Sequence, residues 1–251
     1  MQLDLFDQKI DRAIRRLKEN EPEGKLYYGA FSGGKDSITI HRLAEMAGVN
    51  VEWFYNVTTV DPPELVRFIR HEYPHVKFNR PEMTMWQLII KKRMPPTRIA
   101  RFCCEYLKEH GGDGRTIMSG VRRQESNNRS KRQELECFAK KGISKIVVNP
   151  IIDWTENDVW AFIREQKMAY CCLYDEGFKR LGCIGCPQGR KKQQVPQFKR
   201  WPHMKRLYIK AFGKCIEQNN YDGMWTSAEN MFDWWTNNPG KKDKKQMGLF
   251  E

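Results

Sequence analysis

The stretch Tyr27-Tyr28-Gly29-Ala30-Phe31-Ser32-Gly33-Gly34-Lys35-Asp36-Ser37 decides the fold. Its first part belongs to the apolar run from Leu26 to Phe31, which is typical of a buried strand. Two glycines follow, and apolar residues then recur at helical spacing from Ile38 to Ala47, which predicts a helix packed on that strand. A strand, a glycine turn and a helix in this order present backbone N–H groups and a positive helix end to a phosphate.

The side chains of this turn also suit a phosphate, since Lys35 supplies a mobile cation and Ser32 and Ser37 supply hydroxyls. The Walker A spacing is nearly met, but Asp36 stands where that pattern needs a Ser or Thr for magnesium. The dinucleotide pattern G-x-G-x-x-G is absent. The sequence of residues 32–37, Ser-Gly-Gly-Lys-Asp-Ser, resembles instead the PP-loop of the ATP pyrophosphatase (adenine nucleotide α-hydrolase) superfamily, whose members cleave ATP between the α- and β-phosphates.

Length and composition predict one large α/β domain with a helical appendage, since the chain has 251 residues and 40% of them are hydrophobic. No apolar run approaches the roughly 20 residues of a membrane span. The acidic segment 1–7 lacks the basic-then-apolar order of a secretion signal, so a cytoplasmic location is expected.

The net charge of +13 and the pI of about 9.4 favour polyanionic partners: nucleotides, sulfated or phosphorylated substrates, or nucleic acid. Part of this charge lies in the tail at residues 241–245, which is typical of a solvated chain end. The charge alone therefore does not distinguish among these kinds of partner.

Strands and helices alternate along the chain, which predicts a Rossmann-like parallel sheet with flanking helices. Further strands are expected near residues 49–57, 75–78, 116–119 and 145–148. Polar residues lie just past the second strand and are candidates for the adenosine side of a nucleotide or for a metal: Asn56, Thr58, Thr59 and Asp61. We expect the α/β domain to span residues 1–190, and a helical C-terminal region with a basic tail to span residues 191–251.

The expected strand at 116–119 runs into Gly120-Val-Arg-Arg-Gln-Glu-Ser-Asn-Asn-Arg129. Arg122, Arg123 and Arg129 would form a clamp for phosphate or sulfate, because guanidinium groups bind these anions through paired hydrogen bonds. A solvated basic loop is the alternative. The position directly after a strand favours the clamp.

Eight cysteines include two pairs that suit a metal centre, Cys103-Cys104 and Cys183-x-x-Cys186. Adjacent cysteines make a poor local disulfide, but both can reach a cubane cluster, whose irons are separate targets, so a [4Fe–4S] cluster is favoured. Tetrahedral zinc is the rival, although it usually draws its ligands from two C-x-x-C-like knuckles.

The other four cysteines have no assigned chemistry at this point. We interpret Cys171 and Cys172 as bystanders near the metal ligands, and Cys137, on an expected amphipathic helix, and Cys215 as core thiols.

Several motifs together resemble those of the phosphoadenosine phosphosulfate (PAPS) reductase family within the PP-loop superfamily, over about residues 24 to 190. They are the loop 32–37, Gly120-x-Arg-Arg-x-Glu-Ser-x-x-Arg129, the segment 150–160, Leu173-Tyr174-x-x-Gly177 and Gly182-Cys-x-x-Cys-Pro187. The cysteine set resembles the cluster ligands of adenylyl-sulfate reductases. The Glu-Cys-Gly-Leu-His motif, whose cysteine attacks sulfur in true sulfonucleotide reductases, is absent here, and the loop has the form seen in members that use ATP itself.

The main hypothesis is thus an ATP-binding, [4Fe–4S]-containing PP-loop enzyme acting in sulfur transfer or activation. Loop residues 32–37, Asn56, Gly120 and Arg129 would bind the nucleotide, with Mg²⁺ near Asp36, and Lys35, Asp36, Arg122 and Arg123 would act in catalysis. A sulfonucleotide reductase proper, with Cys215 or a cysteine near 171 as nucleophile, and a nucleic-acid-binding module with structural zinc are the alternatives. A thiol reductant or sulfur donor and a second copy of the chain are further expected partners.

Overall fold

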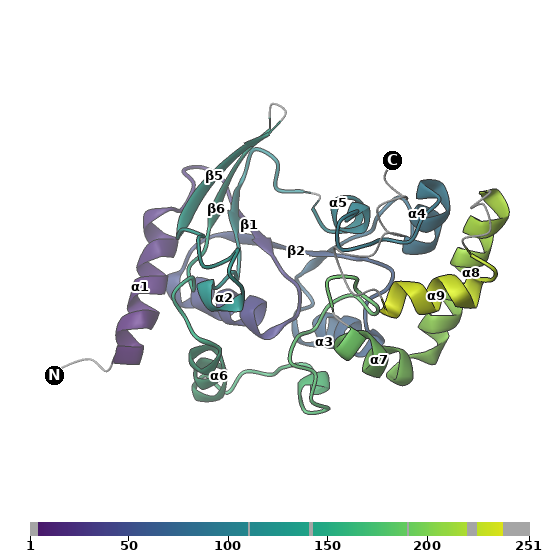
Figure 1. Cartoon of the computed structure of the whole chain (residues 1–251). Helices are drawn as coiled ribbons and strands as arrows, with labels where there is room; N and C mark the ends of the chain where they lie inside the picture. Colours follow the sequence, from purple (N-terminus) through teal and green to yellow (C-terminus); the bar gives the residue numbers. More distant parts are fainter. Residues whose placement is uncertain (1–4, 110, 141–142, 190, 220–224, 238–251) are drawn as a thin grey trace. The chain divides into compact units, whose positions relative to one another are not determined.

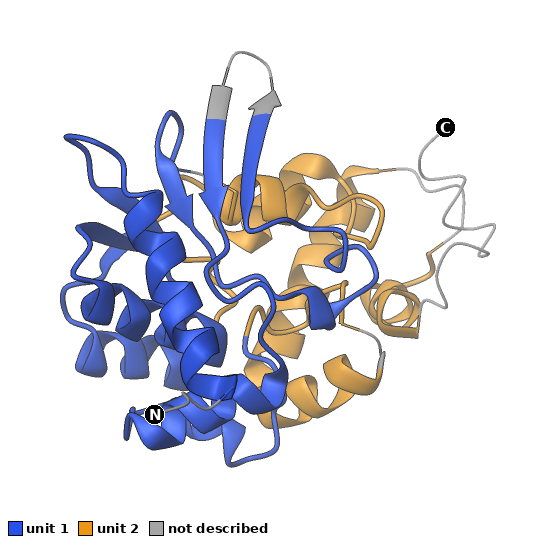
Figure 2. Cartoon of the chain, turned by 90° about the vertical axis from the view of Figure 1, so that its left-hand side faces the viewer, with its two compact units in different colours: residues 1–56, 63–79, 110–181 blue, residues 57–62, 80–109, 182–251 orange. Residues whose placement is uncertain are grey.

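The computed structural model describes residues 5–109, 111–140, 143–189, 191–219 and 225–237. It divides into two compact units, shown in blue and orange in Figure 2. Unit 1 holds residues 1–56, 63–79 and 110–181, and unit 2 holds residues 57–62, 80–109 and 182–251. Each unit therefore combines separate stretches of the chain. The division at residue 190 expected from the sequence stays a prediction, and its basic tail, at 238–251, lies outside the described residues.

Unit 1 is built on a six-stranded sheet with the order β3-β2-β1-β4-β6-β5 (Figure 1). The strands are β1 (Tyr27–Ala30), β2 (Val51–Asn56), β3 (Lys77–Asn79), β4 (Thr116–Met118), β5 (Leu135–Lys140) and β6 (Ile143–Val148). Every neighbouring pair is parallel except β5 and β6, which are antiparallel. The predicted Rossmann-like parallel sheet is confirmed, with one antiparallel strand added at its edge.

The helices of unit 1 are α1 (Leu5–Glu19), α2 (Lys35–Ala47), α3 (Pro63–Glu72) and α6 (Glu156–Glu165), with short 3₁₀ turns η1 (Arg123–Glu125) and η2 (Cys172–Tyr174). Helix α2 packs against α1 and α6. It ends at Gly48, whose left-handed backbone (φ 68°) allows its N–H to reach the last carbonyls. Helix α6 begins with a capping box between Thr155 and Asp158, as its sequence predicts.

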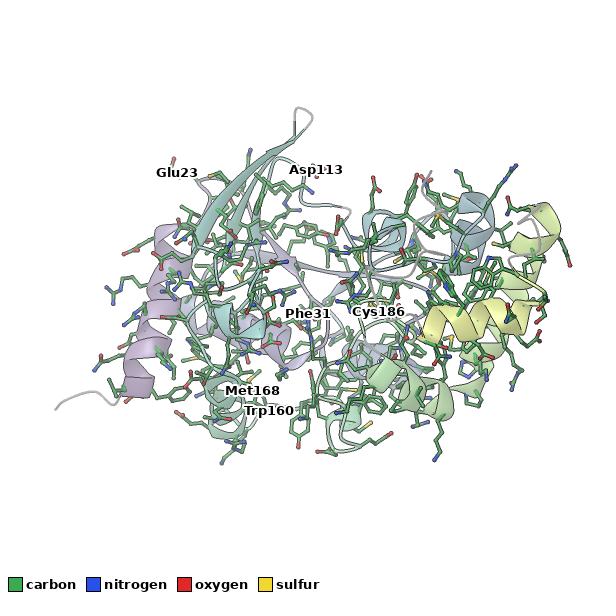
Figure 3. The ribbon with its side chains drawn as sticks, in the orientation of Figure 1. Glu23, Phe31, Asp113, Trp160, Met168 and Cys186 are labelled. Atoms are coloured by element: carbon green, nitrogen blue, oxygen red, sulfur yellow. The ribbon has the colours of Figure 1, made fainter. Side chains whose placement is uncertain are left out.

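The core of unit 1 is apolar and aromatic around β1 and α2. Tyr27 and Ile38 are fully buried, and Phe31, labelled in Figure 3, packs on Trp53 and Tyr73 with ring centroids 5.9 and 4.8 Å apart. Burying such side chains contributes about 2 kcal/mol each, so β1 and α2 are held firmly. The turn between them is thereby fixed in place.

Unit 2 is helical: α4 (Met85–Lys92), α5 (Phe102–Leu107), α7 (Lys191–Arg200), α8 (Pro202–Gln218) and α9 (Ala228–Asn237). Helix α8 packs against α4 and α9 through aromatic rings. The ring of Tyr208 lies 4.9 Å from that of Trp86 and 4.7 Å from that of Trp235. None of the helices in the described part of the chain is long and apolar enough to cross a membrane.

The segment around Cys137 is a strand, and the helix expected there is wrong. Residues Leu135–Lys140 form the edge strand β5, because each of them pairs through its backbone with β6. Cys137 is exposed, so its interpretation as a core thiol is wrong as well. Cys215 is fully buried, as a core thiol should be.

The chain order of the sheet reverses between β1 and β4. From β1 the chain continues to β2 and β3 on one side, and then returns to place β4 on the other side of β1. Open α/β sheets bind ligands at such a reversal, beyond the carboxyl ends of the two strands. In this protein these ends lead into the loop at 32–34 and the segment Ser119–Val121.

Candidate active site

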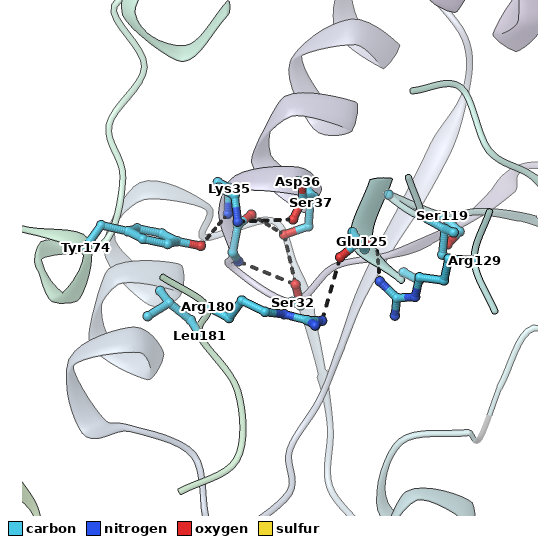
Figure 4. Close-up of a pocket in the computed structure, with 14 residues that line it drawn as sticks. Ser32, Lys35, Asp36, Ser37, Ser119, Glu125, Arg129, Tyr174, Arg180 and Leu181 are labelled. Atoms are coloured by element: carbon cyan, nitrogen blue, oxygen red, sulfur yellow. Dashed lines mark hydrogen bonds and ion pairs between the residues drawn. The ribbon is translucent and has the colours of Figure 1, made fainter. Parts of the chain in front are cut away.

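A pocket of unit 1 opens at this reversal, and Figure 4 shows it in close-up. Its lining comes from the end of β1 and the start of α2, from the segment after β4, and from the loop after α6. The lining residues are Ala30, Ser32, Gly34, Lys35, Asp36, Ser37, Ser119, Gly120, Val121, Glu125, Arg129, Tyr174, Arg180 and Leu181. Most of the predicted nucleotide-binding residues are therefore brought together, although their function stays a prediction.

The turn from β1 to α2 needs its glycines for steric reasons. Gly33 has a φ of 70°, and a Cβ there would lie 2.7 Å from the side chain of Ile69. Gly120 lets the segment after β4 approach α2, since a Cβ there would lie 3.1 Å from the carbonyl oxygen of Asp36. Both strand ends can thus converge on one pocket.

A hydrogen bond joins the two serines of the loop. The hydroxyls of Ser32 and Ser37 lie 3.2 Å apart, and Ser37 Oγ donates to the carbonyl oxygen of Gly34 at 2.8 Å. This arrangement holds the first turn of α2 at the pocket wall, where its N-terminal end favours an anion.

Tyr174 contributes a contact that the sequence did not predict. Its phenol oxygen accepts a hydrogen bond from the backbone N–H of Lys35 at 2.8 Å (Figure 4). Burial raises the pKa of this phenol well above its usual value, so it stays protonated. The hydroxyl at the start of α2 therefore keeps a proton that it can donate.

The side chain of Lys35 is buried, so the mobile cation expected from the sequence is wrong. Only 3% of the residue is exposed. Its Nζ donates to the carbonyl oxygen of Lys179 at 3.2 Å and lies 3.6 Å from Glu156 Oε1 and 3.7 Å from Asp36 Oδ2. Lys35 is a fixed charge of the pocket wall.

Asp36 forms an ion pair with Arg122. Arg122 Nε donates to Asp36 Oδ1 at 2.6 Å, and the arginine side chain is only 4% exposed. The pair explains how a carboxylate can stand at the start of α2 without repelling an anion, because Arg122 offsets its charge. Arg122 itself is not among the residues that line the pocket.

Glu125 holds two arginines of the pocket, Arg129 and Arg180. Arg129 Nη1 donates to one carboxylate oxygen, and Arg180 Nη2 lies 3.7 Å from the other. Burial alone would raise the pKa of Glu125, but the charge of Arg129, a backbone N–H of Arg122 and the charge of Arg180 bring it below its usual value. Arg180 was missed in the sequence, because it lies between two of the quoted motifs, three residues before Cys183.

Two residues expected at the site lie elsewhere in unit 1. The Arg123 side chain donates to the carbonyl oxygen of Arg132 at 3.1 Å, and Asn56 Oδ1 accepts from Asn79 at 3.0 Å. Neither is among the described residues that line the pocket. Their assigned roles stay predictions.

The four predicted metal-binding cysteines all belong to unit 2. Cys103 and Cys104 open α5 and hydrogen bond to each other, and Cys183 and Cys186, the latter labelled in Figure 3, follow in a loop. The hydrogen bond between the two thiols lowers the pKa of Cys104 and raises the pKa of Cys103. Burial and the charges of the other three cysteines raise the pKa of Cys103 further. The four sulfurs are therefore electrostatic neighbours.

The Lys108 side chain and the Thr58 hydroxyl lie close to these thiols. The pKa of Lys108 is raised by the charges of Cys183, Asp61 and Cys186, although the residue is exposed at the surface of the unit. Cys183 Sγ donates to Thr58 Oγ1 at 3.4 Å. A donor set of four thiols beside a cation fits an anionic cluster or a zinc–thiolate centre. Within the described ranges, no three Cys, His, Asp or Glu are grouped as for a single metal ion.

The remaining cysteines of the C-terminal half differ in exposure. Cys171 is buried and Cys172 is exposed at the start of η2. Cys215 Sγ donates to the carbonyl oxygen of Ile89 at 3.2 Å inside the packing of α4 and α8. A thiol buried in this way is not placed to attack a substrate.

Comparison with known proteins gives consistent matches. Residues 27–189 match the model of the phosphoadenosine phosphosulfate reductase domain. An uncharacterized protein of Methanocaldococcus jannaschii is 30% identical over 200 residues, which cover 75% of this chain and 46% of that protein. An adenosine 5'-phosphosulfate reductase of Neisseria meningitidis is 36% identical over 107 residues, covering 40% of this chain and 43% of the enzyme. The chain thus spans less than half the length of these relatives.

Among solved structures, the phosphate complex of phosphoadenylyl-sulfate reductase from Candida auris is similar, with a TM-score of 0.54 and 17% identity. The match covers 73% of this chain and 97% of that enzyme. At this identity the likeness shows a common fold.

Proposed function

Because this chain belongs to the phosphoadenosine phosphosulfate reductase domain family, we propose that it is an enzyme that binds an adenine nucleotide in the pocket of unit 1 and acts in sulfur transfer or activation. The observation that carries this proposal is the convergence of loop 32–37, the segment Ser119–Val121 and two arginines at the reversal of the sheet. ATP is the favoured nucleotide, since the loop has the form of ATP-using members.

The charges of the pocket support an anionic ligand. Lys35 and Arg122 are balanced by Asp36 and Glu156, but Glu125 alone faces both Arg129 and Arg180. The cluster therefore carries one positive charge more than it carries negative charges. A phosphate or sulfate group can offset that excess through charge-assisted hydrogen bonds.

The fixed donors suit charge that develops on a phosphate. When water or an acceptor group attacks the α-phosphorus of ATP, a new bond to that phosphorus forms, and pyrophosphate leaves with additional negative charge. The start of α2 and the Tyr174 hydroxyl are held in advance, so they would stabilise that charge at little reorganisation cost. A Mg²⁺ ion bound with the nucleotide would add Lewis-acid stabilisation.

We assign four of the five cysteines of unit 2 to a [4Fe–4S] cluster, with zinc as the alternative. Cys103, Cys104, Cys183 and Cys186 would supply the thiolates, and the adjacent pair suits separate irons better than one zinc ion. When bound, the cluster would carry sulfur or orient the substrate. Lys108 would offset its negative charge.

A strict sulfonucleotide reductase is less well supported. The burial of Cys215 argues against its role as the nucleophile. Exposed Cys172, two residues before Tyr174, is the thiol that this alternative would need.

The proposal is tested by titrating the full chain with ATP, adenylyl sulfate and PAPS in a calorimeter. Arg180→Ala and Arg129→Ala should each weaken binding about tenfold or more, because each removes a charged donor from the pocket. Arg132→Ala is the matched control, since this arginine follows in the same loop, pairs with Glu136 and lies outside the pocket lining, and it should leave the affinity within about twofold. Equal losses in all three variants, or no binding of any nucleotide, would refute the assignment.

A further inference from the structure

We propose that the outer face of α8 in unit 2 binds the phosphate backbone of duplex DNA. This basic face is defined by Arg206, Lys210 and Lys214, which are all exposed. They follow one another at i, i+4 and i+8, so they lie on one side of the helix at intervals of about 6 Å. The inference concerns a surface separate from the nucleotide pocket and does not depend on it.

Most charged residues of α7 and α8 are basic. Helices α7 and α8 carry eight Lys or Arg residues, four in each, and one acid, Glu217. The whole chain has 44 basic and 31 acidic residues, so the imbalance is concentrated here. Within the described part of the chain, the three residues of the basic face take part in no ion pair with a carboxylate. Their charge is available to an external anion.

The positive charges of the basic face repel one another along α8. Arg206 with Lys210, and Lys210 with Lys214, are like-charge pairs at i, i+4, and such pairs destabilise a helix. Folding alone would favour an acid at one of these positions. A polyanion bound along the helix would turn this repulsion into a favourable interaction.

The opposite face of α8 is buried in the core of unit 2. Met204, Tyr208, Phe212 and Cys215 are buried against α4 and α9. An amphipathic helix that binds a membrane inserts its apolar face between lipids, and here that face belongs to the core. On the outer side Leu207 is the large apolar residue, 38% exposed. The face therefore fits a soluble polyanion better than a lipid surface.

A duplex fits better than a single strand. Proteins that bind single strands stack bases on exposed aromatic rings. The aromatic side chains of α7 and α8, Phe198, Tyr208 and Phe212, are buried, as is Trp201 between the helices. The basic face offers cations without a stacking surface, which is the chemistry of contacts to duplex phosphates.

The test is fluorescence anisotropy with the full chain and a labelled DNA duplex of about 20 base pairs, without nucleotide. Three phosphate contacts predict that affinity falls about 40-fold between about 50 and about 200 mM salt. Lys210→Glu with Lys214→Glu should weaken binding at least about tenfold at the lower salt. The neutral pair Lys210→Gln and Lys214→Gln should give a smaller loss in the same direction, and circular dichroism verifies that each variant is folded.

The matched control is Arg15→Glu with Lys18→Glu, which makes the same charge change on exposed positions of α1 in unit 1. It should bind within about threefold of the unaltered chain. Absence of duplex binding at low salt, equal losses in both charge-reversal pairs, or tighter binding to the single strand or to phosphatidylserine vesicles would each overturn the proposal. Failure here leaves the nucleotide proposal intact, because pocket variants test it separately.

Discussion

The backbone N–H of Lys35 donates a hydrogen bond to the phenol oxygen of Tyr174 at 2.8 Å, across 139 positions of the sequence. This contact joins the first residue of α2 to the turn η2 and places a hydroxyl at the end of the helix where a phosphate would bind. The loop that we propose to bind phosphate is therefore completed by a distant residue.

Tyr174→Phe should lower the free energy of unfolding by about 1 kcal/mol, because the N–H at the start of α2 loses its acceptor. The same variant should weaken nucleotide binding, since the pocket loses a donor. Urea unfolding followed by fluorescence measures the first effect. Tyr170→Phe is the control: its exposed hydroxyl bonds to Asp175 at 3.1 Å, and its loss should change stability by no more than about 0.5 kcal/mol.

The buried pair of Arg122 and Asp36 should contribute far more to stability than an exposed pair. Arg122→Ala leaves the Asp36 carboxylate without its main partner and should cost about 3 kcal/mol. Arg12→Ala removes an arginine from Asp153, where the Arg12 side chain is 51% exposed, and should cost at most about 1 kcal/mol. Chemical denaturation of both variants compares them, and equal losses would contradict the burial of the first pair.

His41 should make stability depend on pH. Burial lowers its pKa to about 4, with the nearby charges of His75 and Arg42 acting in the same direction and Glu45 opposing them. Its Nε2 lies 2.8 Å from that of His75. Between pH 6.5 and about 4 the unfolded chain binds a proton that folded His41 refuses, so this contribution is complete above pH 6.5 and is lost as the pH falls.

The effect of His41 can reach about 3 kcal/mol over that range. Unfolding curves at several pH values for His41→Gln should therefore differ from those of the unaltered chain in slope against pH. A slope that survives His41→Gln would show that other groups cause it.

The cysteine assignment predicts that some Cys→Ser variants lose iron and sulfide and that others keep them. Ser in place of Cys103, Cys104, Cys183 or Cys186 should each lower the iron and sulfide content of anaerobically purified protein from about four of each per chain, because each change removes a ligand. Cys137→Ser, on the exposed edge strand, should not. Zinc at one ion per chain without iron would replace the cluster assignment with a zinc site.

Much of the fold and part of the site could be predicted from local patterns. The apolar run before Gly33, the glycine that ends α2 and the capping box at Thr155 are local signals, and the structure follows them. The edge strand β5 was missed, because its pairing comes from the backbone of β6 and its own side chains are partly exposed.

The contacts of the pocket residues could not be predicted from local patterns either. The sequence places Lys35 and Asp36 in a phosphate loop, but their partners Glu156 and Arg122 come from distant elements, and these decide that Lys35 is buried and that the charge of Asp36 is offset. Arg180 and Tyr174 join the pocket only because the loop after α6 returns to β1. Spacing along the chain carries no direct signal of such contacts.

The most direct test of ATP cleavage by this protein is to incubate the anaerobically purified full chain with ATP, adenylyl sulfate and PAPS in separate reactions and to separate the products. We predict AMP and pyrophosphate in equal amounts from ATP and water, with loss of this turnover in Arg180→Ala and retention in Arg132→Ala. Release of sulfite from adenylyl sulfate or PAPS with a thiol reductant, while ATP stays intact, would contradict it and make the chain a sulfonucleotide reductase.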